Sequence, residues 1–502
     1  MVQPPVPTAA TTDDMAPRPR NHGGRRALLL GLLIAFCALA VIGIVTYVGW
    51  NIGPLALGIG IAGAILPVPV LVACFLWLDR YDPSPMWIIL VSFLWGAGVA
   101  TSAALTLNTL ASDLFQRHHL SDNLVAVLVA PVVEETLKAG FPLLLFVFYR
   151  RAFTGIIDGI VFCGLSATGF AMVENILYLG GHGYAPQAEK GYAAGAFAVT
   201  AIFIVRVPLT GFAHPLFTSM TGIGLGIAAR SPRRTVRVLA PLLGLLSAMI
   251  LHGSWNFMTV LAQDEPYFIL YGYFAVFVPI FIAMLGVVLW LRSWEGRLAE
   301  RILPVYVNAG WFSPPEVAAL GTLGRRLSAR KWAKRVAGDA GQAAMRGYQF
   351  AATRLALLRD GINRGLYAQP RDLASTVAEE RRLLDAIDGY RKIFAGRDPL
   401  TPRAWWNGGT YQIEFPDRVV RTVAAPPLPV VPVPFEFAPP ARYHYPGAPP
   451  YGPAGAPPYG PPPGPAQTPQ AHQPWLPPSD QTYGDQRYGD QGYRDDRYPG
   501  QR

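Results

Sequence analysis

The sequence predicts an all-α, multi-pass membrane protein with about eight transmembrane helices, a small cytoplasmic helical domain and a disordered Pro/Tyr/Gly-rich C-terminal tail. Two observations support this class. Hydrophobic residues make up 51% of the 502 residues, which is too apolar for an ordinary soluble protein. These residues are concentrated between Ala27 and Leu291, and outside that range the chain is basic, proline-rich or both.

The apolar region divides into eight segments at the length of about 20 residues that a helix needs to cross a bilayer. They lie near 27–50, 55–78, 86–110, 124–149, 156–180, 197–229, 237–262 and 267–291. The first has the basic flank of a signal peptide but is longer and lacks a cleavage site, so we expect a retained helix. The sixth is too long for one span, and its Pro208 and Pro215 predict a kink or a later start.

Arginines in the connecting loops predict the orientation of the segments. They are frequent in alternate loops, at Arg25 and Arg26, Arg80, Arg150 and Arg151, Arg230 to Arg237, and Arg292 and Arg297. By the positive-inside rule we expect a multi-pass protein of the plasma membrane with both termini in the cytoplasm. The net charge of +10 is therefore no sign of nucleic-acid binding, and no basic run is interleaved with aromatic residues. The lipid bilayer is the expected environment.

The remaining chain divides by composition. We expect a disordered cytoplasmic N-terminus over 1–26, the transmembrane domain over 27–292, and a cytoplasmic helical domain over 293–423 with amphipathic periodicity. Residues 424–502 repeat GAPPYG and YGDQ, and such a segment cannot bury enough apolar surface to fold. We expect a disordered tail, suited to recruiting a partner protein. The cysteines have no pairing or metal-ligand spacing and are expected to be buried small residues: Cys37, Cys74 and Cys163.

Charged residues in the fourth segment are the first sign of chemistry, because a charge at bilayer depth is costly unless it is paired or used. Glu134 and Lys138 are four residues apart and share a helix face, whereas Glu135 lies about 100° around the helix from Glu134. Two adjacent carboxylates in a low dielectric repel each other, which suits one of them to general acid or base work. An internal ion pair with Lys138 that holds helices together is the alternative.

Each of the next three segments adds polar residues. The fifth carries Glu174 and Asn175, which could instead form a polar clamp between helices. The sixth carries His214 before Pro215, and a lone membrane histidine is often only a hydrogen-bond partner. The seventh carries His252 and Asn256 on one face, where a histidine can bind metal or shuttle protons and an amide can stabilise an oxyanion.

The ordered motifs resemble those of the PrsW family of intramembrane proteases, which is related to CAAX-processing and bacteriocin-processing membrane endopeptidases. They are Glu134-Glu135-x-x-Lys138, Gly169-Phe170-Ala171-x-x-Glu174-Asn175, His214, and His252-x-x-Trp255-Asn256. Asp79-Arg80-Tyr81-Asp82 before Pro85 resembles the family's loop after its second helix, although Ser84 stands where the family usually has glutamate. The resemblance covers roughly residues 55–290.

The resemblance implies a bacterial intramembrane metalloprotease that cleaves a membrane-anchored protein, with anti-sigma factors as the associated substrates. It implies Glu134 or Glu135 as the general base, His252 and Asn256 as the oxyanion or ligand pair, and Glu174 and His214 as the remaining polar wall. Lys138 and Asn175 complete the set of expected catalytic residues. The metal stays open. Zinc suits four ligands such as Glu134, Glu174, His214 and His252, whereas no His-Glu-x-x-His occurs and Lys138 brings a positive charge to the face of Glu134.

Two other functions are compatible with these residues. Chains of Glu and His also serve as proton relays in transporters and channels, but the sequence shows no internal repeat of the kind common in secondary transporters. The other is a catalytically silent membrane scaffold that acts through its cytoplasmic part. The paired glutamates and the His-x-x-x-Asn face favour the protease.

Overall fold

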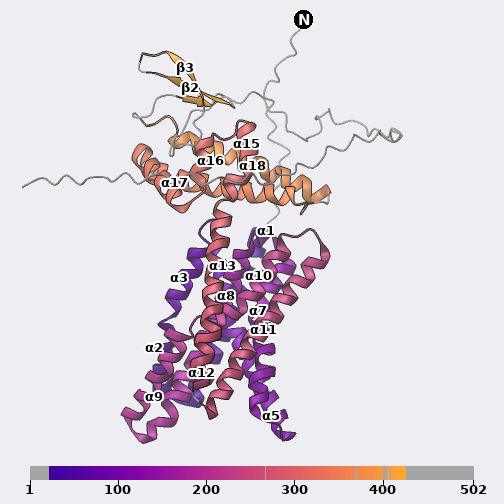
Figure 1. Ribbon diagram of the computed structural model, residues 1–502, viewed down its shortest axis with the longest axis vertical. Helices are drawn as coiled ribbons and strands as arrows, with labels where there is room; N and C mark the ends of the chain where they lie inside the picture. The colour runs from indigo at the N-terminus through magenta and orange to yellow at the C-terminus, as the bar shows by residue number, and fades with distance from the viewer. Residues whose placement is uncertain are drawn as a thin grey trace, which may run out of the picture. The chain divides into compact units, whose positions relative to one another are not determined.

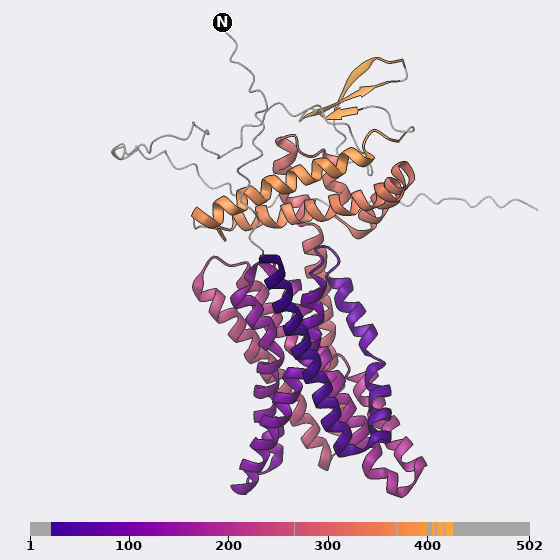
Figure 2. The same ribbon diagram turned by 180° about the vertical axis from the view of Figure 1, so that it is seen from behind.

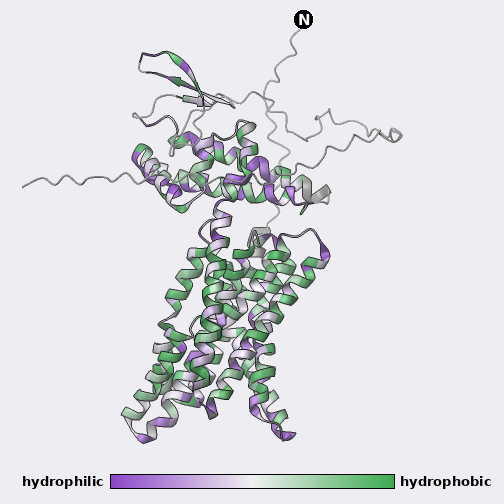
Figure 3. Ribbon diagram, viewed as in Figure 1, coloured by the Kyte–Doolittle hydropathy of each residue, from purple (hydrophilic) through white to green (hydrophobic). Residues whose placement is uncertain are grey.

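The computed structural model describes residues 22–265, 267–367, 370–398, 404–406, 409–415 and 417–424. The expected disorder of the tail after residue 424 lies outside these residues, as does most of the N-terminal stretch 1–26 that was expected to be disordered. Residues 22–26 are described and differ from that expectation, because they form the start of the first helix, His22–Ile52. The described chain is nearly all helical, with long apolar helices (Figure 1), which confirms the predicted class of an all-α multi-pass membrane protein. Figure 3 shows the helical bundle as predominantly hydrophobic, whereas the helices between residues 298 and 394 contain both hydrophobic and hydrophilic residues.

The bundle is built from the helices of the first 296 residues. They are α1 (His22–Ile52), α2 (Pro54–Ile65), α3 (Val68–Leu78), α4 (Met86–Leu94), α5 (Thr101–Arg117), α6 (Asp122–Leu124), α7 (Ala130–Phe148), α8 (Ile156–Ile176), α9 (Tyr192–Ile204), α10 (Ala213–Ala229), α11 (Arg234–Asp264), α12 (Tyr267–Gly272) and α13 (Val278–Gly296). Short π-helical stretches lie at Trp95–Ala100, Val125–Val129, Leu177–Tyr184, Val205–Leu209 and Tyr273–Phe277, and 3-10 turns at Arg150–Ala152 and Ala185–Lys190.

Seven helical stretches of the described chain are long and apolar enough to cross a membrane. The eighth expected segment, 124–149, forms the continuous helical run 122–148 but is less apolar because Glu134, Glu135 and Lys138 lie in it. The expected break in the sixth segment falls at 210–212, between the π-helical stretch that contains Pro208 and α10, which begins one residue before His214. The second segment is also interrupted, at Leu66 and Pro67, a break that the segment analysis did not predict.

Helix α8 is the centre of the bundle and is buried along almost its whole length. Glycines let its neighbours approach closely. A Cβ on Gly159 would lie 2.0 Å from the carbonyl oxygen of Gly222 in α10, and a Cβ on Gly222 would lie 2.3 Å from that of Gly159. Such backbone contact between small residues is a usual means of packing helices in membranes. Figure 2 shows α1, in indigo, along the outside of the bundle.

A second core follows the bundle. It comprises α14 (Leu298–Ile302), α15 (Pro304–Asn308), α16 (Pro314–Leu320), α17 (Leu323–Asn363) and α18 (Pro370–Phe394), with an antiparallel sheet of order β1 (Ala404–Trp406), β2 (Thr410–Glu414) and β3 (Val420–Ala424). Trp332, Tyr348 and Phe394 pack in its centre, and Trp406 of β1 is buried with them. The strands are a difference from the purely helical region that the sequence predicted here.

Candidate active site

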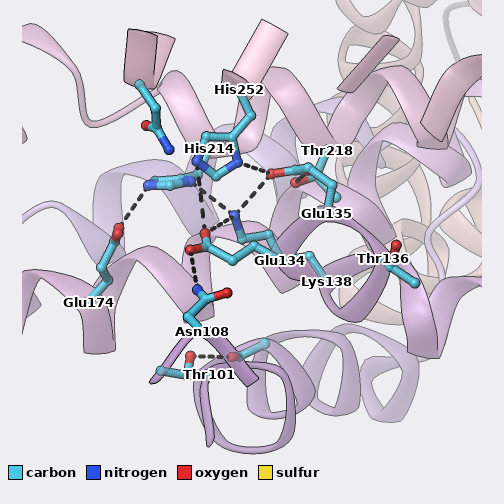
Figure 4. A network of polar contacts seen from close by, with 12 residues as sticks. Thr101, Asn108, Glu134, Glu135, Thr136, Lys138, Glu174, His214, Thr218 and His252 are labelled. Carbon is cyan, nitrogen blue, oxygen red and sulfur yellow. Dashed lines mark hydrogen bonds and ion pairs between the residues drawn. The ribbon is translucent and has the colours of Figure 1, made fainter. Parts of the chain in front are cut away.

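Helices α7, α8, α10 and α11 bring the charged and imidazole side chains together inside the bundle (Figure 4). α7 carries Glu134, Glu135 and Lys138 on its buried side. Pro142 lies within α7 and has no N–H to donate to the carbonyl of Lys138 four residues earlier. The hydroxyl of Ser166 in α8 donates to that carbonyl instead, at 2.7 Å. The hydroxyl of Ser166 thus replaces the missing backbone donor, so Pro142 does not leave this carbonyl unpaired. The same hydrogen bond links α7 to α8 beside the charged residues.

The ammonium of Lys138 is the hub of the cluster. Its Nζ lies 3.1 Å from Oε2 of Glu134, 2.9 Å from Oε1 of Glu135 and 3.1 Å from Nδ1 of His214. It also lies 4.1 Å from the ring centroid of Phe170. The side chain of Lys138 is fully buried. The ion pair of Lys138 with its neighbouring glutamates, considered above as the alternative to catalysis, is therefore present, and the contacts extend to the histidine of α10.

His252 is held by Glu135. Nδ1 of His252 lies 2.9 Å from Oε1 of Glu135, whose Oε2 accepts a hydrogen bond from Thr218 at 2.7 Å. Because a carboxylate accepts hydrogen bonds, Nδ1 is assigned as the donor, and in the neutral ring the lone pair is then on Nε2. That Nε2 faces Oε2 of Glu134, 3.8 Å away.

His214 is held in the same way by Glu174. Its Nε2 lies 2.8 Å from Oε2 of Glu174, and its Nδ1 receives the contact from Lys138. Arg206 donates to the same Glu174 oxygen at 2.6 Å and to Oδ1 of Asn175 at 2.8 Å. The two imidazole rings meet edge to face with centroids 5.2 Å apart. Both histidines are thus oriented by a carboxylate of their own, as metal-binding and proton-transferring imidazoles commonly are.

Glu134 differs from Glu135 in access. The side chain of Glu135 is fully buried, and both of its oxygens are engaged, whereas the side chain of Glu134 is 10% exposed. Oε1 of Glu134 accepts a hydrogen bond from Asn108 of α5 at 3.2 Å. Of the paired carboxylates, Glu134 is the one that a water molecule or a substrate can reach.

The donor atoms of Glu134, His214 and His252 lie within 4.8 Å of one another, so these three could hold a metal ion. One oxygen and two imidazole nitrogens are ligands that suit zinc. Each histidine also contacts a carboxylate through its other ring nitrogen, which is common for histidines that bind zinc. The expected fourth ligand, Glu174, instead binds the far nitrogen of His214 and Arg206. The donor types suit a divalent cation, but the Lys138 ammonium already contacts Oε2 of Glu134 and Nδ1 of His214 at 3.1 Å, so a cation bound by these two atoms would have to displace it.

Two expected site residues face other partners. The side-chain oxygen of Asn175 accepts a hydrogen bond from Arg206, which also donates to Glu174. Asn256, one turn beyond His252 on α11, donates from Nδ2 to the carbonyl of Ala126 at 2.8 Å. Among the hydrogen bonds that the structure describes, neither amide contacts the histidines or the paired glutamates.

Three residues outside the expected set take part in the cluster: Asn108, Arg206 and Thr218. Asn108 and Arg206 are polar residues within apolar segments, which is a signal that sequence inspection could use. Thr218 gives no such signal, because threonine is common in membrane helices and usually bonds to its own backbone.

A cluster of carboxylates and imidazoles inside an apolar helical bundle suits an intramembrane hydrolase, and it would also suit a proton relay. Comparison with known proteins makes the class specific. The profile of a family described as PrsW family intramembrane metalloprotease matches residues 84–284, a range that contains every expected site residue. No solved structure matches the chain.

Individual relatives agree with the family profile. Protease PrsW of Bacillus subtilis (strain 168) is 30% identical over 210 residues, which cover 42% of this chain and 87% of the relative. Protease PrsW of Geobacillus kaustophilus (strain HTA426) is 26% identical over 208 residues, covering 41% and 83% respectively. The chain therefore belongs to the PrsW family and is an intramembrane protease. The helices and strands beyond residue 296 lie outside the matched region.

Proposed function

We propose that the chain hydrolyses a peptide bond of a membrane-anchored protein, with Glu134 as the group that takes a proton from the attacking water. This proposal is supported by the arrangement around Glu134, the more exposed carboxylate of the pair. Two imidazoles, each oriented by another carboxylate, lie beside it. A positioned carboxylate in a site of low dielectric is suited to general base catalysis. An anti-sigma factor is the substrate that the family resemblance suggests.

The other residues have distinct proposed roles. Glu135 orients His252, and Glu174 with Arg206 orients His214. The lone pair of His252 Nε2 can accept a proton or bind a metal, so an oxyanion donor must come from elsewhere. Asn256 is the proposed donor, because its Nδ2 has two hydrogens and the bond to Ala126 uses one.

A metal, where bound, would be held by one oxygen of Glu134 together with His214 and His252, and would supply Lewis-acid activation of the carbonyl or of water. The second oxygen of Glu134 would remain to accept the proton. We expect stoichiometric zinc in the purified protein and loss of cleavage on chelation, with recovery on metal return. The assay uses purified protein in lipid vesicles with a substrate that has one membrane-spanning segment, together with elemental analysis. Cleavage that persists in metal-free protein would contradict the requirement for a metal but would be compatible with general base catalysis by Glu134. Absence of cleavage of such substrates by zinc-loaded protein would contradict the proposed function itself.

We further propose that both termini are cytoplasmic, as the arginine-rich loops suggest. Cysteines introduced at Lys190 and Arg233, both exposed, should then react with an impermeant thiol reagent from opposite sides of the membrane. Cys37 and Cys163 are buried as expected and remain, whereas Cys74 is exposed, contrary to the expectation, and is first changed to serine. Labelling of both positions from the same side would refute this topology.

A further inference from the structure

A cavity of 480 Å³ lies where the ends of two bundle helices meet α17 and α18. This volume is in the range of small-molecule binding sites. The lining residues come from three parts of the chain: the loop after α7, the end of α10, and helices α17 and α18 with the loop between them. The arginines among them are Arg150, Arg151, Arg230, Arg354 and Arg382.

The lining of this cavity carries an excess of positive charge. Five arginines contribute to it, against Asp360 and Glu379 as the acidic residues. Arg230 pairs with Asp360 at 2.6 Å, and Arg382 pairs with Glu379, so the two acids are already engaged. The positive charge that remains favours an anion in the cavity.

Two of these arginines are fixed in place and still have donors to offer. Arg150 donates from Nη2 to the carbonyls of Ala228, Ala229 and Ser231 at 2.7 to 3.2 Å, which fastens it to the end of α10. Among the described residues, the hydrogen bonds of Arg150 and Arg230 use Nη2 alone. A guanidinium has five N–H groups, so the other nitrogens of both remain for a ligand.

The surroundings of Arg150 and Arg230 also favour an anion. Burial lowers the pKa of Arg150, and the charge of Arg237 lowers it further. Burial likewise lowers the pKa of Arg230; the negative charges of Asp360 and Glu295 oppose this effect, and the charge of Arg364 adds to it. Crowded, partly desolvated cations of this kind are stabilised by a bound negative group.

We propose that the cavity binds a phosphate group, carried by an anionic phospholipid headgroup or by a free phosphate compound. Several guanidinium groups that approach one volume match the oxygens of a phosphate. α7 and α10 end at Phe148 and Ala229, beside the lining residues, and the ends of membrane-spanning helices lie at the depth of the lipid headgroups.

The test compares two double variants of equal charge in the full-length protein. Arg354→Gln/Arg382→Gln removes two exposed lining arginines. Arg346→Gln/Arg381→Gln removes exposed arginines of the same two helices that do not line the cavity, and serves as the control. Binding is measured to nanodiscs of phosphatidylcholine with added phosphatidylglycerol, by counting retained lipids in native mass spectrometry. It is measured to inorganic phosphate by calorimetry in detergent free of phospholipid.

We expect saturable binding of at least one probe, weakened about tenfold or more in the cavity variant and little changed in the control. The probe that binds identifies the source of the phosphate. Equal losses in both double variants would show a nonspecific charge effect and overturn the proposal. Retention of full affinity by the cavity variant, or the absence of saturable binding to both probes, would overturn it as well.

Discussion

Replacing Glu134 by glutamine is expected to lower kcat/KM by roughly 100- to 10,000-fold, the range that a positioned general base contributes. Glutamine keeps the shape of the side chain, and its one carbonyl oxygen can still accept from Lys138, which also keeps the charge of Glu135 as a partner. The variant should therefore fold. Cleavage of a membrane-anchored substrate by purified protein in vesicles measures the effect.

Two further variants make the result for Glu134 specific. Thr136→Val on the same helix is the control, because Thr136 is exposed and its hydroxyl bonds to the backbone carbonyl of Val132 at 2.6 Å. It should retain activity. Glu135→Gln should lose roughly 10- to 100-fold, since Glu135 acts by orienting His252. A Glu134→Gln enzyme with nearly full turnover would show that another group activates the water.

Replacing Lys138 by methionine is expected to lower the free energy of unfolding by roughly 3–5 kcal/mol, because it leaves Glu134 and Glu135 buried without their shared cation. Unfolding by denaturing detergent, followed by tryptophan fluorescence, measures the change. Lys190→Met makes the same substitution at an exposed lysine and should have little effect.

A second substitution separates the charge effect from simple loss of packing. Adding Glu135→Gln to Lys138→Met removes one of the carboxylates left unpaired and should restore part of the stability. A double variant no more stable than Lys138→Met alone would mean that packing dominates, and a stable Lys138→Met protein would mean that Lys138 is not the partner that these carboxylates require.

Much of the fold could be predicted because membrane spans are encoded by apolar length, which is a local property. Pro208 and Pro215 predicted the interruption of the sixth segment for a similarly local reason. The strands β1 to β3 were not predicted, since each is only three to five residues long. Such short strands depend on pairing with one another and on packing of Trp406 against the helices, which a local pattern does not reveal.

The site was predictable in its residue types more than in its pairings. Charge within apolar segments pointed to Glu134, Glu174 and His252. The partners of these residues depend on which helix faces meet, however. His252 meets Glu135 across 117 positions of sequence, and Arg206 meets Glu174 across 32 positions. For this reason Glu174 was expected as a metal ligand, whereas its carboxylate lies behind His214.

The position of the cut tests the central claim, hydrolysis by the Glu134 cluster inside the bundle. Purified protein is reconstituted with a single-span membrane-anchored substrate, and mass spectrometry of the products locates the broken peptide bond. We expect the wild-type chain to cut within the apolar segment of the substrate. The triple variant Glu134→Gln/His214→Ala/His252→Ala should make no such cut. The same cut made at an undiminished rate by that triple variant would contradict the account.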